Sequence, residues 1–349
     1  MQKSTEIYVL CSLLLIITTT FFLGSTVYSY EIKTGLSSDC HEKLTKNAFE
    51  AFLNKKSIPA IKTIVIPEDN RAEKYVNEFF GDLLKSFKTE KERFFASSLL
   101  MGVRWPDEHG RSVTSTEALY ANHGDASDQF EHCLRSKNDD YDNGNFNALK
   151  RTQNFFKDRL IFAASYIFKL PQNKNIKIIE YVEFYGQVEF EVYAPAFYLG
   201  TALHTLQDSF SHTVRTDDLH SILSVLNFVD AISGSFDEQR DGIAHSYHMD
   251  TCDWDGDNAE IITAVTDATE ETFGIFLSQS KSDAEKKVNE IIKNWMLFKP
   301  GCGYSNNYCD SKWLPIIRED PTTPVFGCTV TVLGFKTLTL WKFLLENCL

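Results

Sequence analysis

Three side chains of metal-ligating type recur at intervals of four residues within one apolar segment of the chain. His204, Asp208 and His212 lie in LGTALHTLQDSFSHT, which runs from Leu199 to Thr213. In an α-helix, residues four apart advance by about 400°, so the three side chains project from one face. An adjacent stripe of leucine and phenylalanine repeats at intervals of four and three, which is typical of a core-facing seam. The segment therefore predicts a helix with a polar face beside a packing face.

Burial of three such side chains favours a bound metal ion. A single histidine on an apolar face is more often a hydrogen-bonded structural residue. Burial of an aspartate and two histidines without metal or partners, however, costs on the order of several kcal/mol in lost hydration. Imidazole and carboxylate ligands suit zinc best among the common ions, and manganese or iron would also fit. We therefore expect zinc, with further ligands from other parts of the chain.

Three local contexts offer those ligands. His41 stands at the start of the helical segment HEKLTKNAFEAFL, from which it could point into a bundle. In the motif GVRWPD, an apolar helix is expected to end at Gly102, and Asp107 follows in a rigid Trp-Pro turn. His132 lies in apolar company within FEHCL. Each residue alone is ambiguous, because such an aspartate is more often a helix cap and a lone histidine is more often structural.

Much of the chain carries apolar residues at intervals of three and four, which predicts amphipathic helices. Prolines fall between these runs or at their ends, as they do at helix boundaries. The sequence therefore predicts an all-α, multi-helix bundle around a metal cluster. A short strand is expected in IKTIVIPED and a loop in SKNDDYDNGNFN. The helices are expected at 41–53, 75–87, 91–103, 149–168, 189–212 and 257–279.

The two ends of the chain differ in character from this helical region. Residues 1–29 begin with Lys3 and continue as an apolar run that closes on small residues near Ser29, which is typical of a cleaved secretory signal peptide. An uncleaved signal anchor is the alternative. Residues 30–298 form the expected helical domain. Residues 299–349 contain turn residues, β-branched residues and cysteines, so we expect a small disulfide-rich segment that is irregular or β-containing.

Export and charge restrict the partners of this chain. In a secreted protein the cysteines are candidates for disulfides. Eight cysteines less Cys11 in the signal leave seven, so one is free or pairs with another chain. The formal net charge of −13 disfavours nonspecific binding to phosphate backbones, so no stable nucleic-acid partner is expected. A nuclease that works through metal ions stays open.

The order and spacing of these motifs resemble a known superfamily. His41, GVRWPD, FEHC and LGTALHTLQDSFSH follow one another as in the zinc-dependent phospholipase C and single-strand nuclease superfamily. The chain is most similar to the branch of the fungal heterokaryon-incompatibility protein, and the resemblance covers roughly residues 38–276. It implies an all-α domain that holds two or three zinc ions and hydrolyses phosphodiester bonds.

The resemblance also implies roles for individual residues. His41 corresponds to an early ligand and His132 to the next one. Asp107 corresponds to a carboxylate shared between metals that orients the attacking water, and Asp208 corresponds to a bridging ligand. The ligands implied on the central helix are His204, Asp208 and His212.

The last ligand pair of the family, a histidine followed four residues later by an acid, has no plain counterpart in this chain. The nearest histidines are His245 and His248, and the acidic partner would be Asp241 or Asp250. The number of metal ions, two or three, depends on this pair.

A disulfide is also expected beside the cluster. Cys40 adjoins His41, and Cys133 adjoins His132. If both histidines reach the same metal cluster, the two cysteines could lie within the Cα separation of roughly 4.4–6.8 Å that a disulfide requires. We therefore expect a bridge between Cys40 and Cys133.

The sequence thus favours a secreted hydrolase of the phospholipase C type. Its expected partner is a phospholipid or another phosphodiester, with transient contact to a membrane surface. One alternative is a metal-stabilised binding or structural protein of the same fold without turnover, and another is a nuclease. The acidic stretch DWDGDNAE does not match the ligand spacing of an EF-hand, so we interpret it as a solvated loop before a helix.

Overall fold

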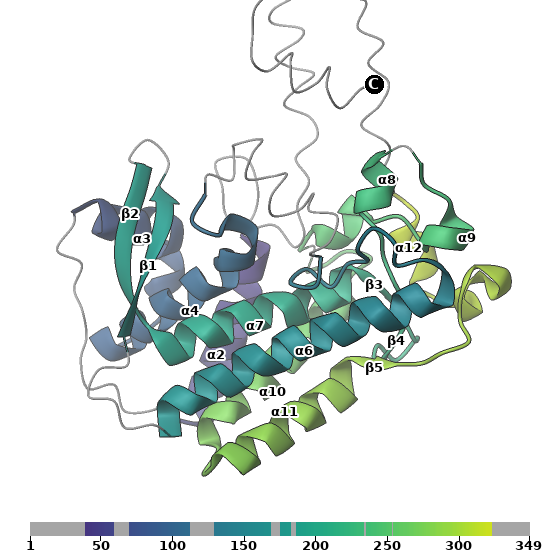
Figure 1. Ribbon diagram of the computed structural model, residues 1–349. Coiled ribbons are helices and arrows are strands. Elements are labelled where there is room, and N and C mark those ends of the chain that lie inside the picture. Colours follow the sequence, from purple (N-terminus) through teal and green to yellow (C-terminus); the bar gives the residue numbers. More distant parts are fainter. Residues whose placement is uncertain are drawn as a thin grey trace, which may run out of the picture.

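The structure is a computed structural model with a mostly helical fold (Figure 1). The signal peptide expected at 1–29, the strand expected at 61–69 and the last part of the C-terminal segment, 323–349, lie outside the described residues. Among the described residues, no helix is both long and apolar enough to cross a membrane. The structure describes residues 39–58, 70–111, 129–168, 175–182, 186–233, 235–252 and 254–322.

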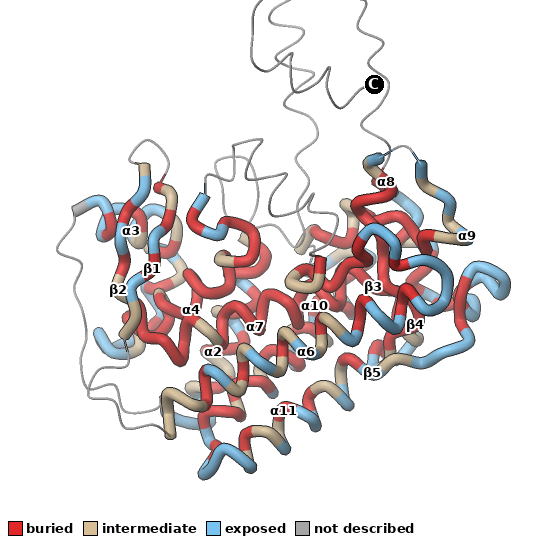
Figure 2. Tube along the Cα trace, in the orientation of Figure 1, coloured by how far each residue is buried: buried red, intermediate tan, exposed pale blue. Residues whose placement is uncertain are grey.

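Helix α7 (Ala194–Ser211) is the central element of the bundle and packs against helices α2, α4, α6 and α10. Every residue of α7 except Tyr198 is buried, and Figure 2 shows buried positions gathered along this helix and the faces that surround it. The long helices of the bundle besides α7 are α2 (Cys40–Lys55), α3 (Asn70–Leu84), α4 (Glu90–Glu108), α6 (Tyr141–Phe168), α10 (Ala259–Thr272) and α11 (Lys281–Trp295). These helices confirm the all-α fold class.

Helices α4 and α7 cross in direct backbone contact, and this crossing decides where Asp107 lies. A Cβ atom on Gly102 of α4 would lie 2.1 Å from the carbonyl oxygen of Phe197, and one on Gly200 would lie 2.3 Å from that of Leu99. Only glycine permits so close an approach. The expectation that the helix ends at Gly102 is therefore wrong. This glycine serves packing, and the helix continues through its proline to place Asp107 in its last turn.

A β-hairpin replaces the first part of the helix expected at 189–212. Strand β1 (Asn175–Val182) pairs antiparallel with β2 (Gly186–Tyr193), and the pair packs on α3 and α4 (Figure 1). Burial in β2 alternates, with Val188, Phe190 and Val192 inside and Glu189 between them. This alternation with period two fits a strand with one buried face. The helix begins only after it, with a proline in its first turn.

The loop expected at 136–147 is helical in its second half, because α6 already begins at Tyr141. The reason is tertiary. The side-chain oxygen of Asn145 accepts hydrogen bonds from Ser224 Oγ at 3.0 Å and from the Val225 backbone N–H at 2.8 Å. A polar side chain that favours a loop by composition is therefore satisfied by a neighbouring strand.

Short elements complete the chain after α7. Strand β4 pairs antiparallel with β3 and parallel with β5, and the two-residue β5 leads into an irregular C-terminal segment with short helices. That segment agrees with the irregular cap expected from residue 299 onward. The elements are β3 (Thr213–Arg215), β4 (Ser221–Val225), α8 (Val229–Ser233), α9 (Glu238–Asp241), η1 (Tyr247–Asp250), η2 (Phe273–Leu277), β5 (Leu297–Phe298), η3 (Tyr304–Asp310) and α12 (Leu314–Ile317).

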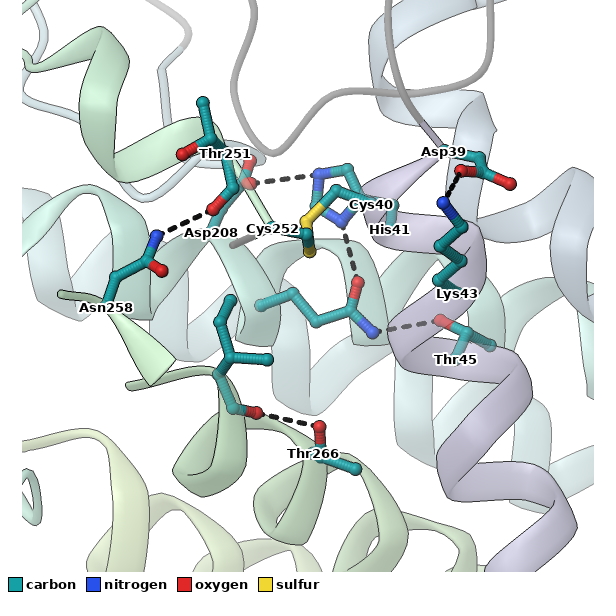
Figure 3. The surroundings of a disulfide bond; sticks show 12 residues. Asp39, Cys40, His41, Lys43, Thr45, Asp208, Thr251, Cys252, Asn258 and Thr266 are labelled. Carbon is teal, nitrogen blue, oxygen red and sulfur yellow. Dashed lines mark hydrogen bonds and ion pairs between the residues drawn. A yellow bond between two sulfur atoms is a disulfide. The ribbon is translucent and has the colours of Figure 1, made fainter. Parts of the chain in front are cut away.

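The predicted disulfide between Cys40 and Cys133 is wrong. Cys40 instead pairs with Cys252, across a Cα separation of 5.4 Å, and Figure 3 shows this bridge beside His41. Cys133 is buried and forms no disulfide within the described part of the chain, and its thiol lies against Thr152 of α6. A second bridge joins Cys302 and Cys309 in the C-terminal segment.

Candidate metal centre

Histidine and aspartate side chains from distant parts of the chain converge around the C-terminal half of α7. Each has a relative exposure of 4% or less. They come from the first turn of α2, the last turn of α4, the turn before α6, helix α7 with its C-cap, and the segment after α9. The first subsite consists of His41, Asp107, His132, His204 and Asp208. The second subsite consists of His212, His245 and Asp250.

Three ligand-type atoms of the first subsite form a nearly equilateral triangle. Asp208 Oδ2 lies 3.1 Å from His132 Nδ1 and 3.0 Å from His204 Nε2. The two histidine nitrogens are themselves 3.1 Å apart. Two ligand atoms that bind one tetrahedral zinc ion at about 2.0–2.1 Å lie about 3.3 Å apart. The triangle therefore has the dimensions of one face of a metal coordination sphere.

Hydrogen bonds on the outer side of the rings fix which nitrogen faces the subsites. The carbonyl oxygen of Val103 can only accept, so His204 donates to it from Nδ1 at 2.8 Å. His212 donates from Nδ1 to the carbonyl oxygen of His132 in the same way. In a neutral ring whose Nδ1 carries the hydrogen, Nε2 presents a lone pair. Outward hydrogen bonds of this kind are typical of metal-ligating histidines.

His41 is oriented by a chain of side chains. The amide nitrogen of Gln207 donates to Thr45 Oγ1 at 2.9 Å, so the amide oxygen faces the ring and accepts from His41 Nδ1 at 2.6 Å. His41 Nε2 then lies 3.2 Å from Asp208 Oδ1, as Figure 3 shows. Although this contact is short, Asp208 Oδ1 makes no hydrogen bond. The two oxygens of Asp208 thus face different histidines, which is the arrangement of a bridging carboxylate.

In the second subsite, too, the two oxygens of one carboxylate face different histidines. Asp250 Oδ1 lies 3.2 Å from His212 Nε2, and Asp250 Oδ2 lies 3.1 Å from His245 Nε2. Asp250 Oδ2 makes no hydrogen bond despite that contact. His212 is the C-cap of α7 and reaches Asp250 rather than the first subsite, so His204, Asp208 and His212 do not converge on a single position.

Asp107 stands slightly apart from the triangle. Its two oxygens lie 3.8 Å from His132 Nδ1 and 3.8 Å from His204 Nδ1, respectively. This separation is larger than the edges of the triangle. Asp107 therefore borders the first subsite, where it could either bind a metal or orient a water beside one.

Burial and neighbouring charges shift the pKa values of the centre in different directions. Burial lowers the pKa of His204 and of His245 to about 4, so both rings are neutral at pH 7. Burial would raise the pKa of the Asp208 carboxyl, but at acidic pH the attraction of protonated His204, His212 and His41 outweighs burial and holds this pKa well below its usual range, so Asp208 stays ionised even where these rings carry a proton. An ionised carboxylate therefore faces the lone pair of His204 at 3.0 Å.

The other two carboxyl groups respond mainly to burial. Burial, together with the charge of Asp208, raises the pKa of Asp107 well above its usual range. Burial also raises the pKa of Asp250 to about 7, although the neighbouring His212 opposes this shift. Carboxylates and imidazole lone pairs directed at one another are stabilised when a cation lies between them. These buried groups could therefore bind metal ions.

Not every candidate from the sequence belongs to the centre. His248 is about one-third exposed and lies 3.8 Å from Glu319. Asp241 forms ion pairs with Arg240 and accepts a hydrogen bond from the Asp237 backbone. Of the alternatives for the last pair, the structure thus brings His245 and Asp250 together.

One residue that supports the site, Gln207, was not predicted from the sequence. Gln207 orients His41, and its place next to Asp208 in an apolar helical segment was a usable signal. Comparisons with protein families, curated proteins and solved structures found no match for this chain. The function is therefore inferred from the geometry of this centre together with the sequence motifs.

Proposed function

We propose that this protein is a secreted, zinc-dependent phosphodiester hydrolase of the phospholipase C type. The observation that carries this proposal is the triangle of His132, His204 and Asp208, in which a neutral imidazole presents its lone pair to a carboxylate at 3.0 Å. Imidazole and carboxylate ligands at this spacing suit zinc. The resemblance to the phospholipase C and single-strand nuclease superfamily supports the choice of reaction, and the two disulfides are compatible with export.

The residues divide into ligands and a group that acts on water. The triangle and His41 would hold metal on either side of Asp208, and His212, His245 and Asp250 would hold a further ion. Zinc would supply a water of lowered pKa and neutralise charge on the phosphate. Asp107, whose oxygens lie 3.8 Å from His132 Nδ1 and 3.8 Å from His204 Nδ1, borders this subsite and is placed to orient that water.

A cavity lined by sequence neighbours of Asp107 and His132, although by no residue of the first subsite itself, is the proposed place for the substrate. It has a volume of about 610 Å³ and is lined by Trp105, Glu131 and Thr201. Trp105 precedes Asp107 in the last turn of α4, and Glu131 adjoins His132. The remaining lining combines isoleucine, phenylalanine and tyrosine side chains with Arg159 and Lys177. Apolar walls that include two cationic side chains support a phospholipid as substrate, reached by transient contact with a membrane surface.

The test combines metal content with product release. We expect inductively coupled plasma mass spectrometry to find two or three zinc ions per chain, and phosphatidylcholine vesicles to yield a phosphorylated headgroup. Single-stranded DNA serves as the second substrate, and release of nucleotides alone would refute the phospholipase assignment. In the Asp107→Asn variant, turnover should fall by about 10²–10⁴-fold while circular dichroism shows an intact fold. Retained turnover would remove Asp107 from the mechanism.

A structural role for the metals is the second candidate function. The observation in its favour is burial, since every residue of the two subsites has an exposure of 4% or less. Structural zinc sites are closed, whereas catalytic sites keep an open position. Bound zinc with no product from either substrate would favour a metal-stabilised binding or structural protein.

A further inference from the structure

A buried arginine lies beside the first subsite and holds two carboxylates. Arg104 has a relative exposure of 1%, and its Nη1 donates to Glu42 Oε1 at 2.7 Å. Its Nη2 donates to Glu108 Oε1, and the guanidinium lies 4.8 Å from the ring centre of Phe79. Tyr75 closes the group from the other side, with its hydroxyl 3.4 Å from Glu108 Oε2.

The two carboxylates are the direct neighbours of metal-site residues. Glu42 follows His41 in the first turn of α2, and Glu108 follows Asp107 in the last turn of α4. A single guanidinium therefore joins the two turns that carry His41 and Asp107. The planar guanidinium offers donors in a fixed geometry, so it sets both the distance and the relative orientation of its partners.

The other ligands of the first subsite are held by different means. His204 and Asp208 lie on α7, and the glycine crossing fixes α4 against that helix. The crossing at Gly102 lies more than a turn before Asp107, and the start of α2, a helix without glycine, is held by the bridge from Cys40 to Cys252 and by other side-chain contacts. The ends of α2 and α4 therefore rely on side-chain contacts for their register.

We propose that Arg104 is a positioning residue for the first subsite, because it holds Glu42 and Glu108 and thereby sets the placement of His41 and Asp107. This inference rests on the proposed metal centre. It predicts that loss of Arg104 weakens metal binding at the first subsite and leaves the second subsite unchanged. The second subsite takes its residues from the α7 C-cap and from the segment after α9, whereas Arg104 donates to Glu42 of α2 and Glu108 of α4.

A contribution to stability alone would give a different result. Replacing a buried ion-pair group with uncharged side chains of similar size is often neutral or stabilising, whereas removal of one partner leaves a buried charge and destabilises. Arg104→Met removes one partner. The triple variant Glu42→Gln, Arg104→Met, Glu108→Gln removes the guanidinium together with both carboxylates that it holds, so neither of these two is left as an unpaired buried charge, and the variant separates folding from positioning.

The experiment measures zinc affinity at each subsite by competition with a chromophoric chelator, and cobalt spectra report the ligand environment. A His245→Ala variant, which lacks one ligand of the second subsite, assigns the two binding phases. We expect Arg104→Met and the triple variant to bind zinc about 10–100-fold more weakly at the first subsite, the effect typical of lost support for metal ligands. Affinity at the second subsite should stay at the wild-type value.

Arg151→Met is the matched control, because Arg151 also pairs with a carboxylate, Asp139, but contacts no residue of either subsite among its recorded partners. It should leave both affinities unchanged. A triple variant that folds and binds zinc at both subsites like the wild type would overturn the role of Arg104. Absence of zinc binding in the wild type would instead refute the metal centre itself, so the two failures are distinguishable.

Discussion

Removal of the disulfide between Cys40 and Cys252 should destabilise the protein far more than removal of the bridge between Cys302 and Cys309. The first bridge joins residues 212 positions apart, and the second joins residues only 7 apart. A cross-link stabilises mainly by restricting the unfolded chain, and the effect grows with the logarithm of loop length. The chain therefore contains both a long-loop bridge and a natural control.

The loop-entropy relation gives the expected magnitudes. It assigns about 5 kcal/mol to the bridge between Cys40 and Cys252 and about 2.5 kcal/mol to the short one. The difference should be measured by urea unfolding of two double variants, Cys40→Ser with Cys252→Ser and Cys302→Ser with Cys309→Ser, each without metal. The linear extrapolation gives the free energy of unfolding, and unchanged slopes would show that the denatured states are comparable.

Zinc adds a second test of the same reasoning. His41 adjoins Cys40, and Asp250 lies two residues before Cys252. The bridge would therefore hold ligand-bearing segments in place for the metal, so its removal should weaken zinc binding and the loss of stability on removing the long-loop bridge should grow when zinc is present. Equal losses in the two double variants would refute the loop-length argument, and a zinc-independent loss would refute the link between bridge and centre.

Two further predictions concern the helix crossing and the pH dependence of the metal-free protein. Gly102→Ala should destabilise by about 1–3 kcal/mol, because its Cβ would lie 2.1 Å from the Phe197 carbonyl oxygen. In contrast, Gly81→Ala should stabilise the protein by up to about 1 kcal/mol, because Gly81 lies on α3 and a Cβ atom there would have no atom within 4 Å. Equal shifts of the melting temperature in the two variants would contradict the close contact between α4 and α7. Burial raises the pKa of Asp250 from 3.8 to about 7, so the metal-free protein should lose this contribution to stability as the pH rises from about 4 to 7. Asp250→Asn should flatten that part of the stability profile, and an unchanged slope in chemical denaturation would contradict the assignment.

Periodicity predicted the helical elements well where one face packs on the core. The helix around His41 appears where the three-and-four spacing placed it, and the helix around Asp208 does so only from Ala194 onward, because the expected first residues, 189–193, belong to strand β2. The failures arose where tertiary contacts decide. Gly102 looked like a helix end and is a packing contact, and Asn145 looked like a loop residue and is satisfied by a strand.

The candidate site shows the same division between local and distant information. Spacing singled out Asp208 because its neighbours on one helix repeat every four residues. It did not show that His212 turns to Asp250, since this depends on the C-cap geometry of α7 and on a carbonyl group 80 residues away. The Cys40 pairing failed for a related reason, because the partner of Cys40 is Cys252, 212 residues away, and the position of His132 in the centre did not fix where the neighbouring Cys133 lies.

The residues of the two subsites span the chain from His41 to Asp250, and this spread bears on the order of folding. The first subsite stays incomplete until α7 has docked on both α2 and α4. The second also requires the segment that follows α9. Contacts between residues so far apart in sequence form late, because long loops must close first. During synthesis, an emerging chain would thus hold no finished centre until most of its length had left the ribosome, and metal uptake would mark the completion of the tertiary structure.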